Sequence, residues 1–135
     1  MIQRIQSLLL FLSFLLNGAV FFTALYRQAV ADPAGWIGLA FAILLTLAAL
    51  LPLISIFLYG HRPRQRRWVT AGLWVQLLAL GMGTGIFVSL GDFGPFLWEE
   101  GVGLLLMVGA LGTSLFARKK IIDDINLVKS MDRIR

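Results

Sequence analysis

The chain has 135 residues, of which 59% are apolar and 14% are charged, and its mean hydropathy is +0.84. These values exclude an ordinary soluble domain, in which about 25% of residues are charged, and they are typical of a membrane protein. Because the chain has no cysteine, disulfides, thiolate catalysis and cysteine-based metal sites are also excluded.

The net charge of +5 is distributed in a pattern along the chain. Eleven of the twelve Lys and Arg residues lie before the first apolar run, between the second and third, or after the fourth, and only Arg27 lies elsewhere. Loops rich in Lys and Arg remain in the cytoplasm. The pattern therefore predicts four membrane spans with both termini cytoplasmic. Basic residues beside membrane segments are the usual signal of orientation, so nucleic acid is not expected as a partner.

The first span is expected over about residues 7–25, after a short segment whose Ile2, Ile5 and Leu9 already have helical spacing. Residues 29–31, Ala-Val-Ala, have the small-x-small pattern of a signal-peptidase site, which leaves cleavage as an alternative. The apolar run is longer than the 7 to 15 residues of a signal peptide, and only Arg4 precedes it. A retained span is the favoured interpretation.

The second span is expected over about residues 36–59, after the helix-start signal Asp32-Pro33. Pro52 lies inside it and has no N–H to donate to the carbonyl of Ala48, so it should bend the helix. Ser55 or a neighbouring helix could supply the missing donor to that carbonyl.

Residues 60–67 contain four arginines, a proline and a glycine, and they predict a short cytoplasmic turn between antiparallel helices. The third and fourth spans are expected over about residues 68–90 and 97–117. Residues 1–117 would thus form an all-α transmembrane domain, an up-down bundle of four helices. Residues 118–135 would form a short cytoplasmic tail, helical at its start because Ile121, Ile125 and Val128 share a face.

Three stretches of the chain are distinctive as sequence. Residues 1–6 read Met-Ile-Gln-Arg-Ile-Gln, residues 53–59 read Leu-Ile-Ser-Ile-Phe-Leu-Tyr before a basic turn, and residues 127–135 read Leu-Val-Lys-Ser-Met-Asp-Arg-Ile-Arg. In these stretches the chain resembles domain of unknown function 4293, a family of small bacterial membrane proteins. The resemblance implies a multi-pass protein of the bacterial inner membrane with four helices, and it supplies no activity. It also implies that the two termini are where a partner would bind.

Several polar residues lie near or inside the predicted spans. Glu99 and Glu100 begin the fourth helix, where the helix dipole favours anions, so they are interpreted as interfacial anchors in preference to a proton or cation site. Asn17, Gln76 and Thr84 lie deepest, and we expect them to join helices by hydrogen bonds. His61 lies among arginines and is expected to be an ordinary turn residue.

Small residues at a spacing of four predict close helix packing at Gly38 and Ala42 and at Gly81 and Gly85. Packing within one bundle is favoured over packing between copies, and a homo-oligomer stays open. The sequence offers no set of residues that could serve together as nucleophile, base and oxyanion donor. Catalysis, a cofactor and a metal are therefore not expected.

The sequence points to a non-enzymatic accessory or scaffold protein. It would contact a membrane or cytoplasmic protein partner, or anionic lipid, through its basic cytoplasmic face. A subunit of a small transporter or channel is the alternative, suggested by Pro52, the glycines of the later spans and the Glu pair. The predicted contact residues are charged and lie in the 60–67 turn or the tail: Arg62, Arg64, Arg66, Arg67, Arg118, Lys119, Lys120, Lys129, Asp132, Arg133 and Arg135.

Overall fold

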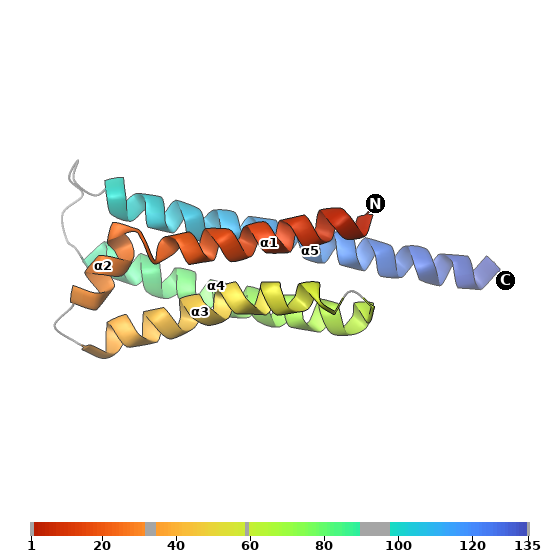
Figure 1. Ribbon diagram of the computed structural model, residues 1–135, viewed down its shortest axis with the longest axis horizontal. Coiled ribbons are helices and arrows are strands. Elements are labelled where there is room, and N and C mark those ends of the chain that lie inside the picture. The colour runs from red at the N-terminus through yellow and green to blue at the C-terminus, as the bar shows by residue number, and fades with distance from the viewer. Residues whose placement is uncertain (1, 32–34, 59, 90–97, 135) are drawn as a thin grey trace.

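The computed structural model describes residues 2–31, 35–58, 60–89 and 98–134, and within them the chain is all-helical, with no strand (Figure 1). There are five helices in these residues: α1 (Ile2–Val20), α2 (Ala24–Ala31), α3 (Gly35–Ile56), α4 (Arg62–Ser89) and α5 (Trp98–Ile134). The helix-start signal Asp32-Pro33 and the connection between the third and fourth expected spans, residues 90–97, lie outside the described residues. The predicted fold class is thus confirmed at the level of an all-α protein.

Three helices, α3, α4 and α5, are long and apolar enough to cross a membrane. The helices α1 and α2 are long and apolar enough to cross a membrane only when they are taken together as one span bent by 50°. Counted in this way, they would add a fourth span. The bend follows Val20, where the amides of Phe21 and Thr23 donate to the carbonyls of Gly18 and Val20, at 3.2 and 3.0 Å. The first span expected over 7–25 is therefore not one straight helix.

The long helices α1, α3, α4 and α5 pack side by side, and α2 turns across one end of them (Figure 1). The helix α1 contacts α3 and α5, and α4 contacts the same two helices, so the four enclose a common interior. The α3–α4 connection and both chain ends lie at the opposite end from α2 (Figure 1).

The interior has an apolar cluster near each end. One joins α2 to the long helices and consists of Val20, Leu25, Ala29, Phe41, Leu45, Ala79, Ile86 and Met107. The other lies toward the chain termini and consists of Leu10, Val69, Leu73, Ala117 and Ile121. The outer surface is apolar as well, with Leu8, Trp74 and Leu105 each about two-thirds exposed. Soluble monomers rarely expose large apolar patches, so this surface fits a lipid environment.

Candidate functional site at the basic end

The helix α5 continues unbroken past the end of its apolar stretch. It runs for 37 residues, from Trp98 to Ile134, which corresponds to about 55 Å of helix. Its last turns extend beyond the ends of the other helices (Figure 1). The tail that the sequence predicted to be helical at its start is thus helical through Ile134, and it continues the axis of the preceding apolar segment.

The first turns of this tail are fixed against the start of α4. Ile121 is fully buried and packs with Leu10 and Val69. One turn further on, Asp124 forms an ion pair with Arg62, with 2.6 Å between Oδ2 of Asp124 and Nε of Arg62. The Asp124 side chain is only 11% exposed, so this ion pair is well shielded on the acid side. The sequence alone does not indicate a role for Asp124, because its pairing depends on how α4 and α5 are placed side by side.

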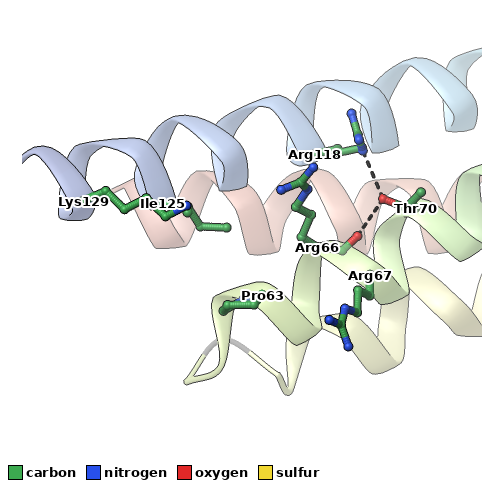
Figure 2. A pocket seen from close by; sticks show the side chains of 7 residues that line it. All are labelled: Pro63, Arg66, Arg67, Thr70, Arg118, Ile125 and Lys129. Carbon is green, nitrogen blue, oxygen red and sulfur yellow. Dashed lines mark hydrogen bonds between the residues drawn. The ribbon is translucent and has the colours of Figure 1, made fainter.

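The surface between the start of α4 and the tail of α5 is hollowed into a groove of about 530 Å³. We call it the α4–α5 groove, and Figure 2 shows the residues that line it: Pro63, Arg66, Arg67, Thr70, Arg118, Ile125 and Lys129. Arg66 and Arg118 reach toward the space between the two helices from opposite sides (Figure 2). Four of these residues are cations, and none of the described lining residues is acidic.

Hydrogen bonds fix one side of the groove. The Nε of Arg118 donates to Oγ1 of Thr70 at 3.1 Å, and that hydroxyl donates to the carbonyl of Arg66 at 2.8 Å (Figure 2). Because Nε is committed to Thr70, the guanidinium plane of Arg118 is held in place beside Arg66. The groove is therefore a partly ordered cluster of positive charge, suited to an anion that accepts hydrogen bonds from guanidinium groups.

A second hollow of about 500 Å³ adjoins the groove and shares Pro63, Ile125 and Lys129 with it. Its other lining residues are Gly60, His61, Arg62 and Val128. A smaller hollow of about 280 Å³ lies on the other side of α4 and shares Arg67 with the groove. That one is lined otherwise by Leu51, Trp68 and Ala71, all apolar in their side chains.

All predicted contact residues except Arg135 fall into three sets. Arg66, Arg67, Arg118 and Lys129 line the α4–α5 groove, and Arg62 lines the second hollow. Exposed positions outside both are occupied by Arg64, Lys119, Lys120, Asp132 and Arg133. Arg135 lies outside the described residues. Thr70 and Ile125 were missed, although the spacing of Arg66 and Thr70 by four, on one helix face, was a usable signal.

A buried polar layer lies between the two apolar clusters. Gln76 donates through Nε2 to the hydroxyls of Ser13 and Ser114 at 3.0 and 3.1 Å, and those two hydroxyls are 2.7 Å apart. Asn17 and Gln76 also donate to the carbonyl of Ala48, at 3.2 and 3.4 Å. The expectation that a neighbouring helix satisfies this carbonyl is confirmed, whereas Ser55 donates to Pro52 instead.

The polar layer joins α1, α3, α4 and α5 by hydrogen bonds, which agrees with the helix-joining role expected of Asn17 and Gln76. Thr84 is not part of it, because it is exposed and its hydroxyl donates to Leu80 of its own helix at 2.8 Å. Gln76 keeps one unsatisfied atom: Oε1 is buried and has no hydrogen-bond partner among the described residues.

The small residues expected to pack helices behave differently from one another. Gly38 is buried, and a Cβ there would lie 3.0 Å from the backbone of Ala29 in α2. Ala42 is half-buried one turn further along α3. Gly81 and Gly85 are exposed, and no described atom lies within 4 Å of a Cβ built on either, so no described helix packs closely on this pair. Gly83 and Gly103 take that role by closely approaching Leu25.

The remaining candidates carry no clear chemistry. The Glu99 side chain lies outside the described part of the chain, while Glu100 is half-buried, and its Oε2 has no hydrogen-bond partner among described atoms. No group of three or more His, Asp or Glu residues that could hold a metal occurs in residues 2–31, 35–58, 60–89 and 98–134. His61 is exposed and lies beside Arg62 at the second hollow.

Comparison with known proteins gives a family and no activity. No curated protein and no solved structure matches this chain. A family model described as "Domain of unknown function (DUF4293)" matches residues 2–134, which include both ends and the basic turn that carry the resemblance in the sequence. Because the match covers essentially the whole chain, this protein belongs to the DUF4293 family.

Proposed function

We propose that this protein is a non-enzymatic accessory or scaffold protein of the bacterial inner membrane. In this proposal four spans cross the bilayer, alternately up and down: the α1–α2 pair, α3, α4 and α5. Both termini then lie in the cytoplasm with the α3–α4 turn, since these are the regions rich in Lys and Arg. The basic end is the surface that contacts a protein partner or anionic lipid.

The observation that carries the proposal is the form of α5. One rigid helix links the apolar segment to a tail that extends past the rest of the bundle (Figure 1). On that tail Leu127 and Met131 are 51% and 62% exposed, one helical turn apart, among charged residues. An exposed apolar pair outside the hydrocarbon is costly in water, so a contact that covers it would be stabilising.

Truncation of the tail tests the proposal. The full-length chain and a chain lacking residues 127–135 are purified in mild detergent, and the proteins that accompany each are compared by mass spectrometry. This deletion keeps Asp124, so the ion pair to Arg62 stays intact, and Lys129 is the one groove-lining residue that it removes. We expect specific partners to be lost.

A matched pair of point variants separates the surface from the fold. Leu127→Ser with Met131→Ser removes the exposed apolar pair, and Ser130→Ala changes the same helix by a similar amount without removing apolar area. The apolar variant should lose the partners and the control should keep them. An unchanged set of partners in the truncated chain, or none with the intact chain, would count against a scaffold.

A subunit of a small transporter or channel is the second candidate, favoured by the buried Oε1 of Gln76 in the polar layer. An unsatisfied acceptor at that depth is costly unless water or a solute supplies a donor. Ion conductance of the purified chain in planar bilayers tests this role. Conductance that falls in Gln76→Leu would support it, and silent bilayers would contradict it.

A further inference from the structure

We infer that the α4–α5 groove binds the phosphate headgroup of an anionic phospholipid from the surrounding leaflet. The inference rests on the proposed function, because it needs the basic end to lie at the membrane surface. It goes further by naming one ligand class and one site: a phosphodiester held between Arg66 and Arg118, with Arg67 and Lys129 at the edges of the groove.

The first argument is charge. The groove brings four cations from two helices to one hollow, and Asp124, the acid next to the lining residue Ile125, is already paired with Arg62. Like charges at such spacing repel one another, and an anion that enters the groove would remove the repulsion. Guanidinium groups match phosphate oxygens with paired N–H donors, which a single ammonium cannot do.

The second argument is depth. Arg118 directly follows the apolar segment that ends at Ala117, and Arg67 directly precedes Trp68, the first residue of the expected third span. The groove is therefore at the level where hydrocarbon gives way to headgroups, because basic and aromatic residues mark that boundary in membrane proteins. Basic pockets between helices at this level bind anionic lipid headgroups in other proteins.

The third argument is the apolar hollow beside the groove. Arg67 lines both, and the rest of the smaller hollow consists of Leu51, Trp68 and Ala71. A free phosphate ion would use only the cationic part. A phospholipid would use both parts, because its phosphate and its acyl chains must be placed side by side. The position of Arg67 between the cationic groove and the apolar hollow is the reason for assigning a lipid and not a soluble anion.

The test measures how tightly the full-length chain in detergent retains phosphatidylglycerol and phosphatidylcholine, by native mass spectrometry of titrated samples. The groove variant is Arg66→Gln with Arg118→Gln. The matched control is Arg64→Gln with Lys119→Gln, which removes two charges from the same helices at exposed positions outside the groove. Inorganic phosphate is added as a competitor in a separate arm.

We expect phosphatidylglycerol to bind the native chain at least tenfold more tightly than phosphatidylcholine. The groove variant should lose at least tenfold more affinity than the control variant. Inorganic phosphate at millimolar concentration should not displace the lipid. Equal losses in the two variants would overturn the site in favour of diffuse surface charge. Equal retention of the two lipids would overturn the headgroup preference, and displacement by inorganic phosphate would overturn the choice of a lipid.

Two further measurements keep the result independent of folding and of the scaffold proposal. Thermal unfolding of each variant reports on folding, and Arg66→Gln alone leaves the Arg118–Thr70 hydrogen bond intact, so it should still weaken phosphatidylglycerol binding. The chain lacking residues 127–135 loses Lys129 but keeps the two central arginines. For this chain both proposals predict that partners are lost and that lipid binding survives. Partners that are retained would contradict the scaffold proposal alone, and lipid binding that is lost would contradict the groove proposal alone.

Discussion

At the scale of single residues, the carbonyl of Ala48 determines how the middle of the bundle is built. Pro52 has no N–H to offer it, and the side chains of Asn17 and Gln76 supply donors from two other helices. A backbone defect in one helix is thereby used to position two neighbours. Interhelical hydrogen bonds of this kind contribute about 0.6 kcal/mol on average and up to about 1.7 kcal/mol in membranes.

Asn17→Ala should therefore lower the free energy of unfolding by about 1 to 2 kcal/mol, because it removes the donor to Ala48 and a buried polar contact. The measurement is reversible unfolding in mixed micelles. Thr84→Ala is the control, since its hydroxyl bonds only to a carbonyl of its own helix in the described contacts, and it should change stability by less than about 0.5 kcal/mol. Similar losses in both variants would contradict this account of the polar layer.

The close approach of α2 to α5 depends on Gly103. A Cβ at this position would lie 2.8 Å from Cβ of Leu25 and 2.9 Å from Oγ1 of Thr23, so Gly103→Ala should destabilise the fold by about 1 to 3 kcal/mol. Gly101→Ala, two residues earlier, meets no described atom within 4 Å and should be neutral or slightly stabilising. Thermal unfolding of the two variants compares them, and equal midpoints would contradict the packing.

At the scale of elements, α5 has two parts that differ in how they are packed. Its apolar part is packed among the other long helices, and its tail is attached only through the start of α4 and the beginning of α1. The Arg118–Thr70 hydrogen bond, buried Ile121 and the Asp124–Arg62 ion pair fix this attachment. Beyond them the side chains from Asn126 to Arg133 are half-buried or exposed, so helix stability should fall toward the end.

Asp124→Asn should loosen the tail without unfolding the bundle. A partly shielded ion pair contributes about 1 kcal/mol, so amide hydrogens after residue 121 should exchange about fivefold faster. Hydrogen-exchange mass spectrometry measures this by segment. Asp123→Asn removes the same charge from an exposed neighbouring position and should leave the exchange unchanged. Faster exchange in both variants would mean that net charge, and not the ion pair, holds the tail.

At the scale of the whole molecule, the proposed orientation places residues 60–67 and the tail on one side of the membrane and α2 on the other. Because the native chain has no cysteine, single cysteines report on each side without interference. We expect Arg64→Cys and Ser130→Cys to react with an impermeant maleimide only after the membrane is permeabilised. Ala31→Cys should react in intact spheroplasts. Labelling of position 130 in intact spheroplasts would overturn the orientation.

Much of the fold follows from the sequence because it depends on neighbours along the chain. The long apolar runs and the need of the Ala48 carbonyl for a donor other than Pro52 were predictable in this way. The expected turn over residues 60–67 was wrong in its extent, because α4 begins at Arg62 and the four arginines lie in its first two turns. The break after Val20 was not predictable, because it is stabilised by Leu25 entering a space opened by Gly83 and Gly103, which are distant in sequence.

The candidate site was predictable only in part. Its cations were evident as two clusters, but the groove depends on how α4 is placed and rotated against α5, and a single sequence does not contain that information. The same limit explains the glycines: a spacing of four identifies a face of α4, yet Gly83 and not Gly81 or Gly85 turns inward.

The unbroken α5 has a mechanical consequence. About 25 Å of helix follows Ala117, so in the proposed orientation the tail is a lever that continues the span formed by α5. Spans tilt when the bilayer becomes thinner. A change of a few degrees inside the lipid would swing the far end of this lever sideways by several times the displacement near its fulcrum. The thickness of the bilayer would thereby determine where the end of the tail lies. A molecule bound to that end would be displaced when the thickness changes.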